Sequence, residues 1–482
     1  MKYLISSFLL VLLISCSSSD GDSDTTPPPP SNTLASVSVV SATNILENSA
    51  TSGGNVTSNG GANVTAKGVC WSTNTNPTIN DNKTSNGNGI GTFTSELTGL
   101  NPNTLYYVRA YATNSEGTAY SSGISFTTEE EPVQCGNVLS TGIELKTQTE
   151  VDNLGAQGIN IINGNLMFDG LSGANSDPII DLSSLSCLQE VNGFILFDNL
   201  ENVETLEGFE NLDYTQGLVF QTTNISSLDA LSSLEIVDGN VIISRNNMLT
   251  NLNGLNGITS ILGTLQIISN DELTNAEGLE SLQSVGEELW IYDNPKLPNI
   301  EGLNNLTQVG GKLYITDNNI LTNIEALSNL ETLSAINIEN NPMLESISAF
   351  SNLTVLTIER LIIKQNSALV SLLGLENINI ITDFVEIRYN DVMINVDGLN
   401  NIETIGNYLT ISDNNLFSDL DGLSNLVSVG GELTIRSDSG TLTNVCGLQP
   451  LLVANGLEGA FSIFIEGFDV TEQDIIDGNC SQ

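Results

Sequence analysis

The sequence predicts an all-β protein made of a small N-terminal β domain and a long solenoid of stacked coils. Two patterns predict this fold. Residues from about 150 to 453 repeat with a period close to 24, and such a period is typical of coils that stack on one another. The preceding region, residues 35–128, has short alternating apolar runs between turn residues, which is typical of a β-sandwich. No repeat has sustained helical periodicity, so the coils are expected to be mainly strand and turn.

Composition limits the functions that the chain can have. It carries 57 acidic against 12 basic residues and no histidine, a net charge of −45. Such a charge repels nucleic acids and anionic lipid headgroups and attracts cations such as calcium. The lack of histidine removes the usual general base and the commonest zinc ligand, although paired carboxylates remain an option. No phosphate-binding loop, nucleophile elbow or C-x-x-C spacing occurs.

The N-terminus reads as an export signal. Residues 1–15 have a basic start and a short apolar run, too short for a stable membrane anchor. Leu13-Ile14-Ser15-Cys16 resembles the lipobox of bacterial lipoproteins, which implies cleavage before Cys16 and lipid attachment to its sulfur. The alternative is an ordinary signal with an incidental cysteine.

Residues 16–34 follow as an acidic and proline-rich stretch, expected to be a disordered tether. An acidic stretch after the lipidated cysteine resembles the signal that some Gram-negative bacteria use to bring lipoproteins to the outer face. The expected location is therefore the outer membrane, lipid-anchored and facing outward.

Residues 35–128 carry a specific motif in the run from Leu100 to Ala110, where apolar residues alternate after a proline turn. This motif resembles the fibronectin type III pattern, with Tyr106 as the corner tyrosine and Trp71 on an earlier core strand. The resemblance implies a spacer or stalk. Cys70 has no evident partner and is expected to be a small buried apolar residue.

The repeats are clearest in two adjacent copies, which run from Val285 to Asn294 and from Val309 to Asn318. One asparagine recurs in eight successive copies, and a glycine recurs in the following segment of most copies, with Ala326 and Ala349 in its place in two of them. We expect the asparagines to form a buried hydrogen-bonded ladder between coils, and the glycines to serve a turn with positive φ or a close backbone approach. The ladder asparagines are Asn246, Asn270, Asn294, Asn318, Asn341, Asn366, Asn390 and Asn414, with Asp438 in the next position.

The L-x-I-x-x-N core of each copy resembles a leucine-rich repeat, but Val-Gly-Gly or Ile-Gly precedes the strand in place of a leucine. The closer resemblance is to the receptor L domain, which implies a right-handed β-helix over residues 133–482. Cys135 and Cys187 flank the first degenerate coils, and Cys446 and Cys480 flank the last. We therefore predict two capping disulfides with these pairings, and a short C-terminal helix within 470–476.

A ligand face is predicted on the outward side of the strands. Leu289 and Ile291 should point inward, whereas Glu288, Trp290 and Tyr292 should point outward. Aromatic and basic residues gather at these outward positions, as a protein- or carbohydrate-binding surface requires. The alternative is that they only stabilise the sheet. The proposed ligand face comprises Trp290, Tyr292, Tyr314, Lys364, Phe384, Arg388, Tyr408 and Arg436.

No metal site is predicted. The Asp-Asn pairs at 293–294, 317–318 and 413–414 could hold calcium between coils, but a turn-capping role is the preferred interpretation.

Three functions follow from these patterns. The leading hypothesis is a non-enzymatic, surface-anchored binding or adhesion protein whose partner is an extracellular protein or polysaccharide. The second is a structural surface-layer component without a specific ligand. The third is a polysaccharide-active β-helix enzyme, for which Arg360, Lys364, Arg388 and Glu386 are the one constellation worth testing.

Overall fold

A computed structural model describes residues 31–170 and 176–482. The chain divides into two compact units, Met1–Pro132 and Val133–Gln482. The predicted signal peptide, the lipid attachment at Cys16 and most of the predicted tether lie outside the described residues. Within the described part, no helix combines the length and the apolar character needed to cross a membrane.

The first unit consists of two antiparallel sheets. One has the order β1-β2-β5, and the other the order β4-β3-β6-β7 with β8 also paired to β6. Val69, Leu97 and Val108, from both sheets, are fully buried in a shared core. The strands are β1 (Ser36–Thr43), β2 (Ser49–Ser58), β3 (Ala66–Ser72), β4 (Asn82–Lys83), β5 (Gly91–Thr98), β6 (Leu105–Asn114), β7 (Gly117–Tyr120) and β8 (Ile124–Thr127).

Tyr106 ties the start of β6 to the loop before it. Its ring is buried in the core, and its hydroxyl accepts a hydrogen bond from the Asn101 N–H at 3.0 Å. This is the geometry of a tyrosine corner. Trp71 lies in the same core, and Cys70 is a buried free cysteine, as the sequence predicts. Burial raises the pKa of the Cys70 thiol to about 11, so the thiol stays protonated and unreactive.

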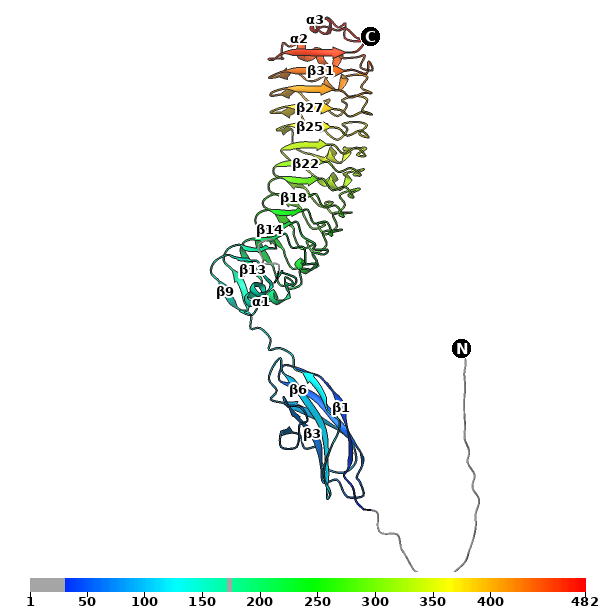
Figure 1. The fold of residues 1–482 in the computed structure, drawn as a ribbon. Coiled ribbons are helices and arrows are strands. Elements are labelled where there is room, and N and C mark those ends of the chain that lie inside the picture. The colour runs from blue at the N-terminus through cyan, green and yellow to red at the C-terminus, as the bar shows by residue number, and fades with distance from the viewer. Residues whose placement is uncertain (1–30, 171–175) are drawn as a thin grey trace, which may run out of the picture. The chain divides into compact units, whose positions relative to one another are not determined.

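The second unit is a solenoid in which one main strand of each coil pairs in parallel with its counterpart in the next coil (Figure 1). The sheet is parallel because each coil returns to the same side before the next strand begins. The main strands are β10 (Ile143–Leu145), β12 (Leu166–Asp169), β13 (Glu190–Asp198), β14 (Tyr214–Gln221), β16 (Val241–Ser244), β18 (Leu265–Ile268), β20 (Leu289–Tyr292), β22 (Lys312–Thr316), β23 (Ala335–Glu339), β25 (Leu361–Lys364), β27 (Val385–Arg388), β29 (Leu409–Ser412), β31 (Leu433–Ser437) and β32 (Phe461–Ile465).

Short strands precede most main strands and pair with each other from coil to coil, forming a second wall. They are β9 (Asn137–Leu139), β11 (Ile159–Ile162), β15 (Ile236–Val237), β17 (Ser260–Ile261), β19 (Ser284–Val285), β21 (Gln308–Val309), β24 (Thr357–Ile358), β26 (Ile380–Ile381), β28 (Thr404–Ile405) and β30 (Ser428–Val429). The rest of each coil is turn, with leucines such as Leu297, Leu303 and Leu306 buried against the strands.

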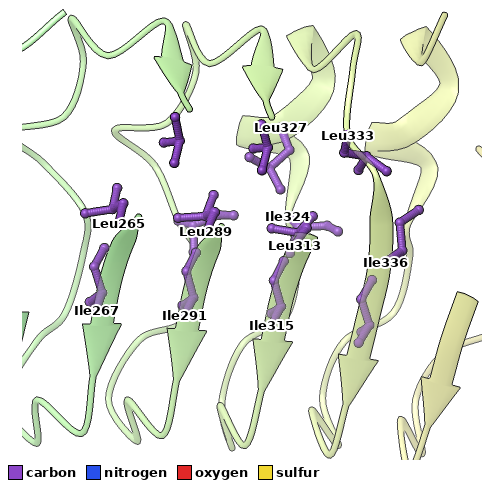
Figure 2. Packing of buried hydrophobic residues seen from close by; sticks show 14 of the residues in the cluster. Leu265, Ile267, Leu289, Ile291, Leu313, Ile315, Ile324, Leu327, Leu333 and Ile336 are labelled. Carbon is purple, nitrogen blue, oxygen red and sulfur yellow. The ribbon is translucent and has the colours of Figure 1, made fainter. Parts of the chain in front are cut away.

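The core consists of columns of equivalent residues. Figure 2 shows Leu265, Leu289 and Leu313 in one row and Ile267, Ile291 and Ile315 in the next. All six side chains are at most 1 % exposed. Because the register repeats residue for residue, Leu289 meets Leu265 on one side and Leu313 on the other. Full burial of one such side chain contributes about 1.5–3 kcal/mol, and this packing holds the short strands in place.

The repeated asparagines form a continuous buried ladder. Asn294 donates through Nδ2 to the Ile267 carbonyl of the previous coil at 2.9 Å and to its own Tyr292 carbonyl at 3.1 Å. Its backbone N–H donates to Asn318 Oδ1 of the next coil at 3.1 Å. The same bonds recur up to Asn414. The ladder ends there, because Asp438 in the next position is exposed and binds Arg436 instead.

A left-handed residue precedes every ladder asparagine. The φ angles are between 52° and 59° at Arg245, Ser269, Asp293, Asp317, Asn340, Gln365, Tyr389 and Asp413. Aspartate and asparagine tolerate this conformation better than most residues do. The Asp-Asn pairs therefore have a role in the turn itself.

The recurring glycine position has two solutions. Gly254, Gly278, Gly302, Gly374 and Gly398 have φ between 106° and 115°. In the other coils a 3₁₀ helix replaces this turn, so alanine fits at Ala326 and Ala349. The 3₁₀ helices are η1 (Ser183–Leu185), η2 (Asp229–Leu231), η3 (Glu325–Asn329), η4 (Ser348–Asn352), η5 (Asp421–Leu423) and η6 (Cys446–Leu448).

Helices and disulfides close the two ends of the solenoid. At the start, α1 (Gln148–Gly155) buries Val151 and Leu154, and Cys135 bonds to Cys187. At the end, α2 (Gln449–Val453) and α3 (Glu472–Ile476) lie beside the Cys446–Cys480 disulfide. Both predicted pairings and the C-terminal helix are thus present. The coils are mainly strand and turn, as expected, and the sequence did not predict α1, which begins with the capping box from Thr147 to Glu150.

Candidate ligand face

The outward side chains of the main strands form three parallel columns. One column precedes the first buried residue of each strand, one lies between the two buried residues, and one follows the second. We call the outward side of β20 to β31 the charged face. It holds Lys312, Arg360, Lys364, Arg388 and Arg436, which are five of the eight basic residues of Val133–Gln482. The columns run without a break because the parallel register is continuous.

The first aromatic pair consists of Trp290 and Tyr314. These residues are register partners on β20 and β22, and their rings stack with centroids 3.7 Å apart. Trp290 Nε1 donates to Glu288 at 2.9 Å, and Arg360 donates to the Tyr314 hydroxyl at 2.8 Å. Tyr314 is only 8 % exposed, so most of its ring is used in packing within the sheet.

The second aromatic pair consists of Phe384 and Tyr408, which stack with centroids 4.6 Å apart. The Tyr408 hydroxyl donates to Glu386 at 3.1 Å, and Glu386 also binds Lys364. Burial, together with the Glu386 carboxylate, raises the pKa of Tyr408 to about 12. The hydroxyl therefore stays protonated at neutral pH and keeps its single hydrogen bond to Glu386.

Arg360 lies between the two aromatic pairs. It follows Ala335 and precedes Phe384 in the first column. Its Nε is buried, as is Asn337 Oδ1 on the neighbouring strand, and neither atom has a hydrogen-bond partner among the described residues. The sequence predicts Arg360 at an outward position just before the first buried residue of its strand, and it also includes Arg360 in the enzyme hypothesis; the contact with Tyr314 comes from the structure. Arg360 and Tyr314 are 46 residues apart in the sequence. Because the two coils between them differ in length, their contact cannot be read from a constant period.

Two cations of the face are direct neighbours. Lys364 and Arg388 are register partners on β25 and β27. Arg388 donates to Ser412 Oγ at 2.8 Å, and its guanidinium lies 5.7 Å from the Tyr389 ring. Like charges opposite each other in a sheet are destabilising, although Glu386 offsets part of this repulsion through Lys364.

The remaining predicted residues lie farther from this centre. Tyr292 is 37 % exposed in the third column, beside Thr316 of β22. Arg436 lies on β31, where it pairs with Asp413 at 3.6 Å and Asp438 at 2.7 Å. The structure therefore brings Trp290 and Tyr314 together as one pair and Phe384 and Tyr408 as another. Lys364 is linked to the second pair through Glu386, and Arg388 lies next to Lys364 at the end of β27 opposite to Phe384.

The carboxylates of the Asp-Asn turns bind polar neighbours. Asp293 accepts a hydrogen bond from Ser269 at 2.9 Å, and Asp317 accepts one from Asn340 at 2.6 Å. Over residues 31–170 and 176–482, no group of three or more acidic or cysteine side chains has an arrangement that could hold a metal ion.

Comparisons with known proteins give one family signal. No curated protein matches the sequence significantly. Among solved structures, the pectate lyase Pel3 from Pectobacterium carotovorum matches with 12% identity over 75% of this chain and 86% of that chain. The TM-score of 0.14 is too low to support a conclusion about fold or activity. The Receptor L domain family model matches residues 160–256, which include β12 to β16.

Proposed function

We propose that this protein is a surface-anchored binding or adhesion protein without catalytic activity, and that its charged face contacts an extracellular protein or glycan. In this proposal the lipid on Cys16 anchors the chain to the outer face of the outer membrane. The N-terminal unit acts as a fibronectin type III-like spacer, which the Tyr106 corner supports. The receptor L domain match within the solenoid supports a role in ligand binding.

The observation that carries the proposal is the adjacency of Lys364 and Arg388. If the outward residues only stabilised the sheet, register partners would be expected to carry opposite charges, because like charges at these positions lower the stability of the fold. In a chain of net charge −45, opposite-charge partners are abundant. Lys364 has two carboxylate neighbours, Glu339 in register and Glu386 in an ion pair, whereas Arg388 lies between Lys364 and Ser412 in its column. This placement of Arg388 supports contact with a ligand that offers hydrogen-bond acceptors or negative charge.

The test uses Arg388→Gln, with Lys296→Gln as the matched control. Lys296 also loses one positive charge in the variant, but it pairs with Glu272 in a turn that follows the ladder, away from the charged face. Wild type and both variants would be screened on an array of glycans and extracellular proteins, with and without calcium. Unfolding free energies would be measured in parallel.

We expect Arg388→Gln to weaken binding of the ligand about tenfold or more, which corresponds to about 1.4 kcal/mol, without lowering the free energy of unfolding. Lys296→Gln should bind as wild type does. Loss of stability with unchanged binding would assign Arg388 to sheet packing. Absence of any ligand in both conditions would favour the structural surface-layer role.

A further inference from the structure

The outward face of β12 to β16 differs in chemistry from the charged face. Its middle column is apolar and consists of Met167, Leu196, Val219 and Ile242, which the parallel register aligns. These strands lie toward the α1 end of the solenoid (Figure 1). The aromatic pairs of the charged face have no counterpart in this column, so these coils need a separate explanation.

A pocket of about 310 Å³ lies on this apolar face. Gly217 creates it: in the first column Gly217 follows Phe194 and precedes Asn240, and it contributes no side chain. A Cβ at Gly217 would lie 3.2 Å from Phe194 Cβ, so any side chain there would fill the space. Phe194 forms one wall and remains 37 % exposed, and Val219 and Ile242 also line the pocket.

Amide side chains provide the polar part of the lining. Asn165 Oδ1 accepts a hydrogen bond from the Phe194 N–H at 3.1 Å, and Asn240 Oδ1 accepts one from the Thr264 N–H at 2.9 Å. These bonds fix both side chains and use their oxygens, which leaves the Nδ2 groups as donors. Gln216 adds a third amide. Two coils therefore present fixed donors beside an exposed aromatic ring.

We propose that this pocket binds one ring of a neutral saccharide. A sugar ring has an apolar face that packs on an aromatic side chain, and hydroxyl oxygens that accept hydrogen bonds from amides. None of the residues described as lining the pocket is ionisable, so it offers no partner for a charged ligand. The net charge of −45 further disfavours anionic sugars.

The site extends beyond one ring. A second hollow of about 530 Å³ shares Asn165 and continues past Met167. Its one ionisable lining residue among those described is Glu144, which would repel a uronic acid. The proposal therefore predicts that affinity rises from a monosaccharide to an oligosaccharide. A protein partner would instead need about 800 Å² of contact surface, far more than one pocket offers.

This inference is independent of the proposed function, because it concerns other coils and other residues. The full chain would be screened against neutral oligomers of glucose, galactose, mannose and N-acetylglucosamine, with uronic acid oligomers as the charged comparison. Binding would then be measured by calorimetry for Phe194→Ala, which removes the platform, and Gly217→Leu, which fills the pocket. Phe464→Ala is the matched control, since Phe464 is another exposed phenylalanine of the main sheet, on β32.

We expect at least one neutral oligosaccharide to bind, with affinity at least tenfold lower in both pocket variants and unchanged in Phe464→Ala and Arg388→Gln. If a pocket variant does not fold, hydrogen exchange of the wild type decides, and the sugar should protect β13, β14 and β16 but not β25 or β27. The proposal fails if no neutral oligosaccharide binds, if only charged sugars or proteins bind, or if Phe194→Ala binds normally.

Discussion

At the scale of single residues, the asparagine ladder shows how one side chain replaces several backbone bonds. The Asn318 side chain satisfies carbonyls of its own and the previous coil, and it accepts from the Asn294 N–H. A buried backbone group without a partner costs about 1–3 kcal/mol. The ladder begins at Thr223, which donates to Asn246 Oδ1 at 2.8 Å. The repeated asparagine pattern does not include this residue, because its side chain carries a hydroxyl in place of an amide.

Asn318→Ala should therefore lower the free energy of unfolding by about 2–5 kcal/mol. The loss leaves the Ile291 and Thr316 carbonyls and the Asn294 N–H without their partner. Asn319→Ala is the control, because Asn319 is exposed. Urea denaturation followed by circular dichroism measures both. Equal stabilities for the two variants would show that water replaces the ladder bonds.

Cys70 provides a pH-dependent prediction. Its folded pKa of about 11 lies above the ordinary value of 9.0, so the folded state keeps the proton while the unfolded chain loses it. The contribution to stability is therefore present below about pH 9 and is lost as the pH rises toward 11.

The Cys70 thiol should react slowly with iodoacetamide at pH 8 in the folded protein and rapidly in denaturant, as peptide mapping by mass spectrometry can follow. In Cys70→Ala, the decline of stability between pH 9 and 11 should be smaller than in wild type. Rapid labelling of the folded protein would contradict burial of this thiol.

At the scale of elements, the coil is a short strand, a main strand and a turn that must return the chain to the next coil. The turn can use a glycine with positive φ, as at Gly302, or a 3₁₀ helix, as around Ala326. At Gly302 a Cβ would lie 2.0 Å from the Ala276 carbonyl oxygen. Glycine is therefore required wherever the first solution is used, whereas Ala230, Ala326 and Ala349 lie in coils that use the second.

The end of the solenoid is expected to depend on its disulfide. Cys446 and Cys480 are 34 residues apart in the sequence. A disulfide that closes a loop of this length stabilises a fold by about 3–4 kcal/mol. Replacing both cysteines by serine should speed hydrogen exchange in β32 and α3 while leaving β20 to β27 protected, since each coil contacts only its neighbours. Uniform loss of protection along the solenoid would show that the coils unfold as one unit.

At the scale of the whole molecule, charge is the dominant feature. A net charge of −45 repels itself within a compact fold, and salt screens this repulsion. We therefore expect the melting temperature to rise by several degrees between about 0.02 M and about 0.5 M sodium chloride. Calcium and magnesium chloride at equal ionic strength should give equal shifts, since the Asp293 and Asp317 carboxylates already bind polar neighbours. A shift specific to calcium would indicate a cation site between coils.

The sequence by itself determined the repeat. Its period placed the inward leucines, the asparagine ladder and the glycine turns, because stacked coils require equivalent residues at equivalent positions. The same logic placed the four capping cysteines at the two ends, where an open coil needs protection. The stacking of Trp290 on Tyr314 and of Phe384 on Tyr408 also follows from a spacing of 24 residues.

Only the tertiary structure decided what lies between those positions. The coils from Asn318 to Asn341 and from Asn341 to Asn366 have 23 and 25 residues instead of 24. The contact between Arg360 and Tyr314 therefore required the strand register that the structure shows. The saccharide pocket exists because Gly217 has no side chain. A glycine leaves a pocket only where the neighbouring side chains do not fill the space, and those neighbours are known only from the structure. Sequence periodicity fixes which residues share a column, whereas the shape of a surface depends on how neighbouring columns fill or leave the space between them.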